Sequence, residues 1–308
     1  MKMNKLLLLV LVIPFCLAAK NPSTEIVGGE KVTDPKDPVY QHSVRLLVKS
    51  TVSDSSENPE EVKGIKFSQR CSGTLIRQNI VLTASHCLPK KVPTKLKNKN
   101  VILDIDLSKI DIRVFTHHSI GGDYSGIKSK KVIRHPGFDD LWYFKLNPED
   151  LWNPEVPIND IALIVMEEDA PSYKKPASLY QGEFSARAQD ITLAGYGKTA
   201  NGGITEKPHL RKVTVPFREY LNNGKDFFVG KGNIDDPSED SDPQGGCFGD
   251  SGGSGYYINQ DGTYSISGVL VRGPNGDKGG CKASVTIMTG VNEYLDFIEQ
   301  TLVDLGSL

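Results

Sequence analysis

Residues 161–166 read IALIVM, a run of branched and apolar side chains that is typical of a buried β-strand. Similar runs recur along the chain with Gly, Pro, Asn and Asp between them, and no helical periodicity persists in the gaps. These runs are residues 44–48, 73–76, 80–83, 191–194, 212–215, 264–271 and 285–288. The pattern predicts an all-β sandwich or barrel.

The C-terminus departs from this strand pattern. Val291, Leu295, Ile298 and Leu302 recur at helical spacing, and Asn292 is placed to cap the start of a helix. We therefore expect one closing helix that packs against the sheet.

Composition sets the broad class of the protein. The chain has 308 residues, a formal net charge of −2, 38% hydrophobic residues and 24% charged residues. These proportions exclude a wholly disordered, collagen-like or multi-span membrane protein, and the length fits two domains or one large all-β unit. A nearly balanced charge also argues against a nucleic-acid-binding protein, so we expect no nucleic-acid partner.

The first residues have the three-part pattern of a secretory signal peptide. Residues 1–17 read MKMNKLLLLVLVIPFCL, and two small residues, Ala18 and Ala19, follow as a cleavage site. An apolar run of about twelve residues spans only about 18 Å as a helix, which is too short for a membrane anchor. A lipoprotein site at Cys16 is disfavoured because the residues before it are not small. We expect a signal peptide over residues 1–19 and a mature protein that is secreted or periplasmic, without a membrane span.

Export changes how the cysteines are interpreted. Without Cys16, four cysteines remain: Cys71, Cys87, Cys247 and Cys281. An even number in an oxidising compartment predicts two disulfides with three possible connectivities, of which the spacing favours the sequential pairs. A metal site is the alternative, but neither a CxxC motif nor a paired histidine spacing supports it.

Three segments have biased, loop-like compositions. Residues 50–61 are polar, residues 90–100 are rich in lysine, and residues 234–244 are acidic. We expect all three to be solvated surface loops.

Residues 249–253 read GDSGG and place Ser251 between glycines. A serine is a poor nucleophile unless a base removes its proton and nearby donors stabilise the resulting oxyanion; glycines allow the sharp turn that aims such donors. A glycine-rich turn alone is weak evidence, but three more motifs accompany it. They are IVGG at residues 26–29, TASHC at residues 83–87 and NDIAL at residues 159–163.

Together these ordered motifs resemble the chymotrypsin/trypsin-type serine proteases. The family's IVGG, DIAL and GDSGG motifs are intact, and its TAAHC motif is TASHC here. The resemblance extends from Ile26 to the C-terminal helix. It implies two six-stranded antiparallel β-barrels, residues 26–175 with His86 and Asp160 and residues 176–308 with Ser251 and the helix.

The resemblance also implies the chemistry of a secreted serine endopeptidase. Ser251 attacks the scissile carbonyl, His86 accepts and returns the proton, and Asp160 holds the imidazole. The backbone N–H groups of Gly249 and Ser251 bind the oxyanion, and an acyl-enzyme forms without a metal or organic cofactor. The family's disulfides correspond to the sequential pairs, Cys71–Cys87 and Cys247–Cys281.

In this family, activation frees the α-amino group of the IVGG isoleucine, which then pairs with the aspartate before the serine. Here these are Ile26 and Asp250, so residues 20–25 form a short propeptide. The residue before the cut is Glu25, so we do not expect trypsin itself to activate the chain: either a protease that cuts after glutamate does so, or processing follows another route. Because an α-amine titrates at a pH of about 8, activity should fall at alkaline pH.

The specificity positions depart from trypsin-like members. Gly245 occupies the position of their primary-pocket aspartate, so cleavage after Arg or Lys is disfavoured. Val271, Arg272 and Gly273 replace the family's Ser-Trp-Gly, and Thr286 stands where a pocket-wall glycine is common. These changes imply an uncharged, mid-sized pocket. Alternatively, Arg272 or Lys282 attracts acidic side chains, or the acidic loop attracts basic substrates.

A catalytically silent, protease-like binding protein is the competing function. Such proteins usually lack a triad member, whereas His86, Asp160 and Ser251 are all present here. Only Val271 and Arg272 support it. We expect a monomeric enzyme that acts on protein or peptide substrates.

Overall fold

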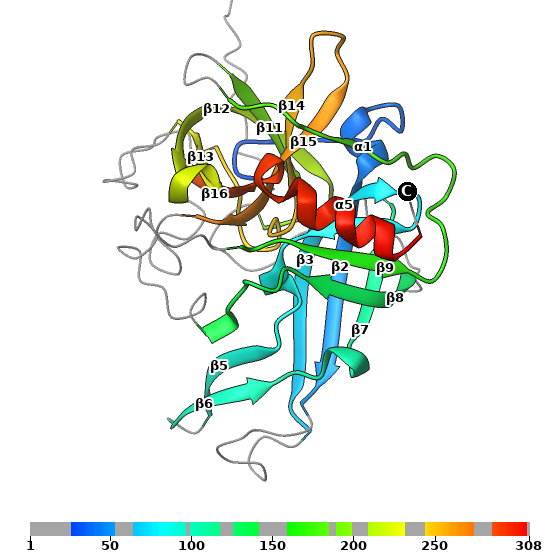
Figure 1. Ribbon diagram of the computed structural model, residues 1–308, viewed down its shortest axis with the longest axis vertical. Coiled ribbons are helices and arrows are strands. Elements are labelled where there is room, and N and C mark those ends of the chain that lie inside the picture. Colours follow the sequence, from blue (N-terminus) through cyan, green and yellow to red (C-terminus); the bar gives the residue numbers. More distant parts are fainter. Residues whose placement is uncertain are drawn as a thin grey trace, which may run out of the picture.

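The computed structural model describes residues 26–52, 64–96, 99–117, 126–141, 159–184, 189–198, 209–231, 244–273 and 285–306. The predicted signal peptide, the propeptide with Glu25, the acidic residues 234–243, Cys281 and Lys282 lie outside these ranges, as does most of the polar segment at residues 50–61. The described residues form two β-barrels, a separate two-stranded sheet and a C-terminal helix, which confirms the all-β, chymotrypsin-like fold class (Figure 1).

Six antiparallel strands close the first barrel. In barrel order they are β2 (Ser43–Thr51), β3 (Lys66–Arg77), β4 (Ile80–Thr83), β9 (Ala162–Met166), β8 (Ile127–Arg134) and β7 (Asp111–Phe115). Strands β4 and β9 are buried along their whole length and pair with each other, with Leu82 opposite Leu163. Their continuous apolar sequences match this burial, because a strand with both faces covered needs no polar alternation.

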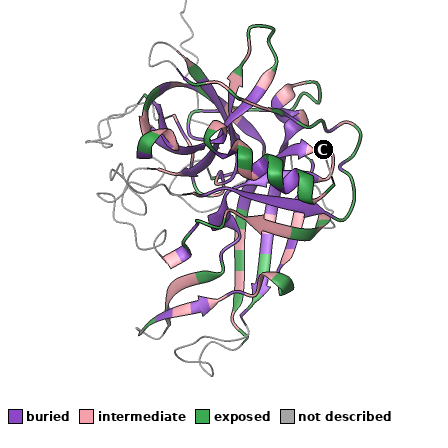
Figure 2. Cartoon of the chain, viewed as in Figure 1, coloured by how far each residue is buried: buried purple, intermediate pink, exposed green. Residues whose placement is uncertain are grey.

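The second barrel is closed by the pairing of β12 with β13. Its strands, in order, are β12 (Arg211–Leu221), β11 (Asp190–Gly195), β14 (Ser254–Ile258), β15 (Tyr264–Arg272), β16 (Val285–Gly290) and β13 (Asp226–Gly230). Two short strands extend this sheet: β1 (Glu30–Lys31) pairs with β12, and β10 (Ser178–Leu179) runs parallel to β15. Buried residues follow the strands of both barrels (Figure 2).

The expectation of a surface loop at residues 90–100 is wrong. Lys91–Leu96 (β5) and Lys99–Asp104 (β6) form a two-stranded sheet of their own. Val101 and Leu103 are buried in the main core, and the partly buried Val92 packs against it. Among the lysines, apolar residues alternate along the strands, and this alternation is sufficient to pack the hairpin against the core.

Among the helical segments whose full bounds lie in the described ranges, all are short except the one at the C-terminus. They are α1 (Pro38–His42), the 3₁₀ turns η1 (Ser85–Cys87), η2 (Leu107–Lys109), η4 (Asn222–Gly224) and η7 (Val291–Tyr294), and α5 (Leu295–Asp304). The closing helix is confirmed, but Asn292 does not cap it: α5 begins at Leu295, and the Asn292 amide donates to Glu293 instead. Within the described ranges, no helix is long and apolar enough to cross a membrane.

Candidate active site

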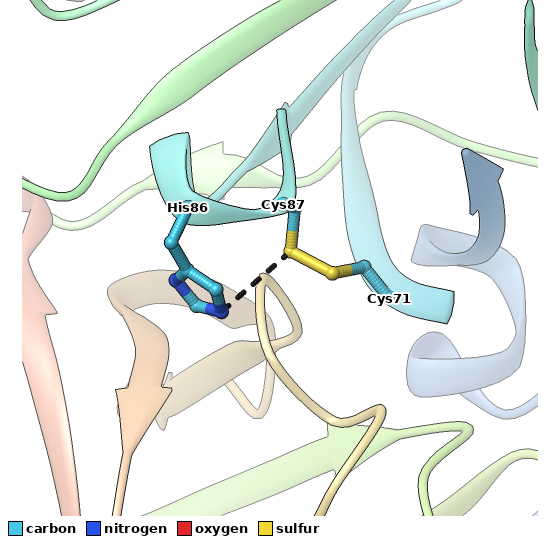
Figure 3. Close-up of side chains that lie close together, drawn as sticks. All are labelled: Cys71, His86 and Cys87. Atoms are coloured by element: carbon cyan, nitrogen blue, oxygen red, sulfur yellow. Dashed lines mark hydrogen bonds between the residues drawn. A yellow bond between two sulfur atoms is a disulfide. The ribbon is translucent and has the colours of Figure 1, made fainter. Parts of the chain in front are cut away.

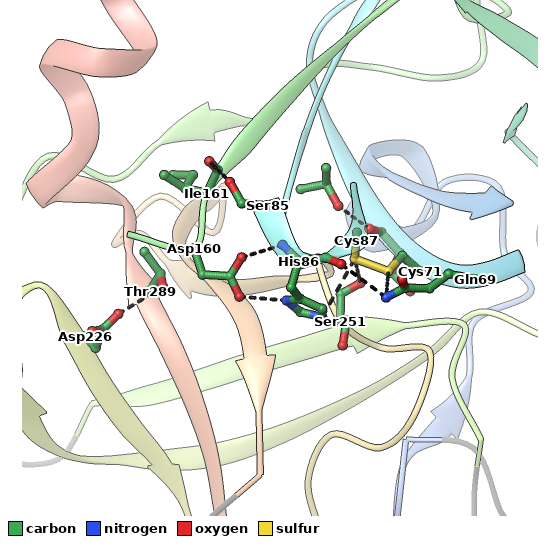
Figure 4. A network of polar contacts seen from close by, with 12 residues as sticks. Gln69, Cys71, Ser85, His86, Cys87, Asp160, Ile161, Asp226, Ser251 and Thr289 are labelled. Carbon is green, nitrogen blue, oxygen red and sulfur yellow. Dashed lines mark hydrogen bonds and ion pairs between the residues drawn. A yellow bond between two sulfur atoms is a disulfide. The ribbon is translucent and has the colours of Figure 1, made fainter. Parts of the chain in front are cut away.

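His86 lies in the 3₁₀ turn η1, which follows β4 directly. Its backbone N–H donates to Asp160 Oδ1 at 2.8 Å, and its ring Nδ1 lies 2.6 Å from Asp160 Oδ2 (Figure 4). Both residues are buried, with 5% and 0% of their surface exposed. Because a carboxylate only accepts, Nδ1 carries the proton of this bond, which fixes the orientation of the ring.

Asp160 precedes β9, and its neighbours hold the backbone there. Asn159 adopts a left-handed conformation with φ of 52°, which asparagine tolerates better than most residues. Its side chain donates to Gly137 O at 3.1 Å and accepts from Tyr294 Oη at 3.1 Å. Burial raises the pKa of Tyr294, as do the nearby charges of Asp226 and Asp160, so the hydroxyl stays protonated and remains a donor.

Ser251 sits in a tight turn of the second barrel that only glycines permit. Gly249 and Gly252 have φ angles of 99° and 80°, in the left-handed region that favours glycine. A Cβ at Gly252 would lie 2.1 Å from Thr83 Oγ1, inside the first barrel's surface. The Ser251 carbonyl accepts from the Ser72 amide at 2.8 Å, which joins the turn to β3.

The two barrels bring Ser251 close to His86. Cys87 Sγ lies 3.9 Å from His86 Nε2 and 3.5 Å from the Ser251 carbonyl oxygen. Figure 4 shows Asp160 on one side of the imidazole and Ser251 on the other. Among the described residues, Ser251 Oγ has no hydrogen-bond partner. The arrangement therefore places a hydroxyl that has no hydrogen bond to any described residue beside an imidazole that a buried carboxylate orients.

The disulfide Cys71–Cys87 is present and lies beside His86, which confirms this predicted pair (Figure 3). Possible metal-ligand atoms of Cys71, His86 and Cys87 fall within 4.8 Å of one another. Both sulfurs are committed to the disulfide, so they offer no thiolate to a metal. Cys247 is also disulfide-bonded, but its predicted partner Cys281 lies outside the described residues.

The amides of Gly249 and Ser251 are available as donors. Within the described ranges, neither N–H donates to a protein acceptor. The Gly249 carbonyl, in contrast, accepts from Ser72 Oγ at 2.9 Å, and Ser72 Oγ in turn accepts from the Tyr196 amide at 3.0 Å. These contacts fix the peptide groups of the turn, as an oxyanion hole requires.

Ile26 and Asp250 are both fully buried in the second barrel. The Asp250 carboxylate accepts from the Gly197 amide at 2.7 Å and from the Cys247 amide at 2.8 Å. Val27, next to Ile26, exchanges backbone hydrogen bonds of 3.0 and 3.1 Å with Gly245. Residues 26 and 27 are therefore attached to the segment that leads from Gly245 to Ser251.

Thr286 and the segment containing Gly245 lie together in the structure. The Gly246 amide donates to Thr286 Oγ1 at 2.9 Å, and Thr286 is 1% exposed. Val271 is buried at the end of β15, whereas Arg272 is half-buried and pairs with Ile287 of β16.

Among the described residues, a Cβ at the remaining predicted pocket residue, Gly273, would contact only Val285 O, at 3.8 Å. Phe248, which follows Cys247, is 49% exposed and was not predicted as part of the site.

The site also contains three residues that were not predicted from the sequence: Ser72, Asn159 and Tyr294. Ser72 follows Cys71, and Asn159 is the first residue of the NDIAL segment, so only proximity to a motif marked them. Tyr294 reaches Asn159 from 135 positions away. Such a contact is created by the fold and has no local sequence signal.

Comparison with known proteins gives consistent matches. The family model described as Trypsin matches residues 26–298. The chain is 27% identical over 263 residues to Serine proteinase stubble of Drosophila melanogaster, covering 81% of this chain but 28% of that protein. It is 26% identical over 249 residues to Chymotrypsin-like elastase family member 1 of Macaca fascicularis, covering 78% and 82%. It is 24% identical over 302 residues to Trypsin Blo t 3 of Blomia tropicalis, covering 92% and 96%.

Proposed function

Because this chain belongs to the trypsin family of serine proteases, we propose that it is an active endopeptidase whose triad is Ser251, His86 and Asp160. The observation that carries the proposal is the 2.6 Å contact between His86 Nδ1 and Asp160 Oδ2, beside the glycine-bounded turn of Ser251. A silent binding protein would not need a buried carboxylate to orient an imidazole next to an unbonded serine hydroxyl.

The proposed reaction is acyl transfer from the peptide to Ser251 and then to water. His86 Nε2 accepts the hydroxyl proton as Ser251 Oγ attacks the scissile carbonyl, and the imidazolium is stabilised by Asp160. The Gly249 and Ser251 amides donate to the oxyanion, and His86 then protonates the departing amine. Catalytic hydrogen bonds are often long before substrate binds, which accounts for the unbonded Ser251 Oγ.

We propose that the primary pocket is uncharged and mid-sized. Gly245 contributes no side chain at its base, and the Thr286 hydroxyl accepts from the Gly246 amide, so neither residue brings a charge to the pocket. Apolar side chains of intermediate size fit such a pocket better than Arg or Lys. Peptide profiling with matched Ala, Val, Leu, Arg, Lys and Glu substrates tests this: the highest kcat/KM for Arg, Lys or Glu would contradict it.

We propose activation by cleavage between Glu25 and Ile26. The buried Asp250 carboxylate receives two backbone donors, and its negative charge favours a new ammonium group nearby. Insertion of the Ile26 amino group would therefore order the segment that holds Gly249 and Ser251. Secretion, the short propeptide and protein or peptide substrates complete this proposal, all from the sequence pattern and the family.

The deciding experiment is fluorophosphonate labelling of the secreted protein, with identification of both the labelled residue and the N-terminus. We expect the label on Ser251 in a chain that starts at Ile26, and no label in Ser251→Ala. A chain that starts at Ile26 and stays unlabelled would establish the binding-protein alternative. Labelling of a chain that still carries its propeptide would contradict the activation step alone.

A further inference from the structure

A buried ion pair contacts the backbone that follows His86. Its two residues lie outside the sequence motifs of the site. Arg134, at the end of β8, and Asp140 join through Nη2 and Oδ2 at 3.0 Å, and their side chains are only 6% and 8% exposed. The Arg134 guanidinium also lies over the Phe138 ring, 4.9 Å from its centroid. Neither charged group touches His86 or Ser251, so the pair takes no direct part in the proposed chemistry.

Both charged groups bind the backbone that follows His86. Arg134 Nη1 donates to the Leu88 carbonyl at 3.1 Å, and Asp140 Oδ1 accepts from the Lys90 amide at 3.3 Å. Leu88 also closes the 3₁₀ turn of His86, because its own amide donates to Ser85 O at 2.9 Å. The ion pair therefore fixes the C-terminal side of the turn that carries the imidazole.

Arg134 also pairs with β9, the strand that follows Asp160. It stands opposite Ala162 in the β8–β9 register, and the next residue, His135, donates from its amide to Ile161 O at 3.0 Å. One side chain thus spans from the Asp160 strand to the His86 turn. It therefore connects the two segments that carry His86 and Asp160, whose side chains are 2.6 Å apart.

The β5–β6 hairpin begins shortly after the His86 turn. The hairpin starts at Lys91, its base is closed by the bond from Ile105 N to Lys90 O at 2.7 Å, and it is a separate sheet that extends from the barrels (Figure 1). The short segment between His86 and Lys90 joins this hairpin to the His86 turn. Arg134 and Asp140 hold that segment against the barrel.

Stability does not account for the pair. Arg134 Nε is buried without a hydrogen-bond partner among the described residues, and burial raises the pKa of Asp140 despite the nearby guanidinium. Both features mean that the hydrogen bonds and the ion pair do not fully offset the cost of removing these two charged side chains from water. Buried ion pairs of this kind contribute little compared with apolar side chains of similar volume.

We propose that Arg134 and Asp140 are positioning residues for His86, which hold its turn in register with Asp160. The inference rests on the proposed function, because it concerns how the imidazole is kept in its working geometry. Misplacement of a reacting group by about 1 Å can cost about 100-fold in rate.

The test is the double variant Arg134→Met/Asp140→Leu, which replaces the pair by apolar side chains. We expect kcat to fall by about 10- to 100-fold, with KM for a short peptide changed by less than about twofold. The melting temperature should stay close to that of the wild type, and the Lys90 amide should exchange faster.

The matched control is Arg113→Gln/Asp111→Asn. It removes a 2.9 Å ion pair from the same barrel, in which the side chains of Arg113 and Asp111 are 35% and 44% exposed. It should leave kcat unchanged.

Arg134→Lys provides a second readout that does not depend on the double variant folding. Lysine keeps the charge but lacks the planar fork that reaches Leu88 O and Asp140 together, so we expect an intermediate kcat. Wild-type kcat in Arg134→Lys, or in a folded double variant, overturns the positioning role. Failure of the wild type itself to label at Ser251 would instead overturn the proposed function.

Discussion

The two barrels hold their shares of the candidate active site by different means. The first barrel orients His86 through bonds to a charged side chain, at 2.6 and 2.8 Å from the Asp160 carboxylate. The second barrel shapes the Ser251 turn through backbone groups and glycine conformations, with φ of 99° at Gly249 and 80° at Gly252. The first half of the site is therefore sensitive to loss of charge, and the second to added volume.

The largest effect should come from the charged half. Asp160→Asn keeps the size of the side chain but lets the amide donate to His86 Nδ1, which stabilises the wrong tautomer, so kcat should fall about 10⁴-fold. Steady-state kinetics on an uncharged peptide measures this. Asp106→Asn, which alters an exposed carboxylate, is the control. A loss of less than tenfold in Asp160→Asn would show that Asp160 does not orient the ring.

The Ser251 turn of the second barrel should be sensitive to added side-chain volume. Gly252→Ala places a Cβ 2.1 Å from Thr83 Oγ1 and 2.5 Å from Ser72 O, and also strains a backbone with φ of 80°. Separation of the barrels by this clash should lower kcat/KM by at least about 100-fold.

Gly262→Ala is a matched control for this change. Its φ is also 80°, but nothing lies within 4 Å of the added Cβ, so it carries the strain without the clash. We expect it to cost only about 1–2 kcal/mol of stability and no activity. Equal activity losses in the two variants would contradict the clash as the cause.

The sequence predicts the barrels better than it predicts the contacts between them. The apolar runs at residues 80–83 and 161–166 became the buried strands β4 and β9 with only small shifts in their bounds, because a covered strand has a strong compositional signal. The β5–β6 hairpin was missed because lysines outnumber the buried Val101 and Leu103 in its surroundings. Ser72 and Gly249 meet across 177 positions, and no local pattern marks such a pair.

Ser72 joins the two halves and provides an intermediate effect. Ser72→Ala removes the bonds from its Oγ to Gly249 O at 2.9 Å and from the Tyr196 amide at 3.0 Å, so the Gly249 peptide loses its fixed orientation. We expect kcat to fall about tenfold with little change in KM, less than for direct loss of an oxyanion donor. Ser43→Ala, which removes a 3.2 Å contact to Tyr256 elsewhere between the barrels, is the control. An equal loss in both would mean that Ser72 acts only through barrel packing.

The smallest effect concerns the segment that connects the barrels, where Lys174 is 1% exposed. Its Nζ donates to the carbonyls of Tyr40 and Ser43, and within the described part of the chain no carboxylate pairs with it. Burial lowers the pKa of this amine from 10.5 to about 7.

Between pH 7 and 10.5 the unfolded chain therefore binds more protons at Lys174 than the folded one, so this group makes stability rise with pH. The slope is at most about 1.4 kcal/mol per pH unit. Chemical denaturation at pH 7.5, 8.5 and 9.5 should show this rise in the wild type and a smaller one in Lys174→Met, with Lys128→Met as an exposed control. Activity should move the opposite way over the same range, because the Ile26 ammonium proposed to pair with Asp250 loses its proton. Parallel loss of stability and activity in the wild type would contradict the separation of these two roles.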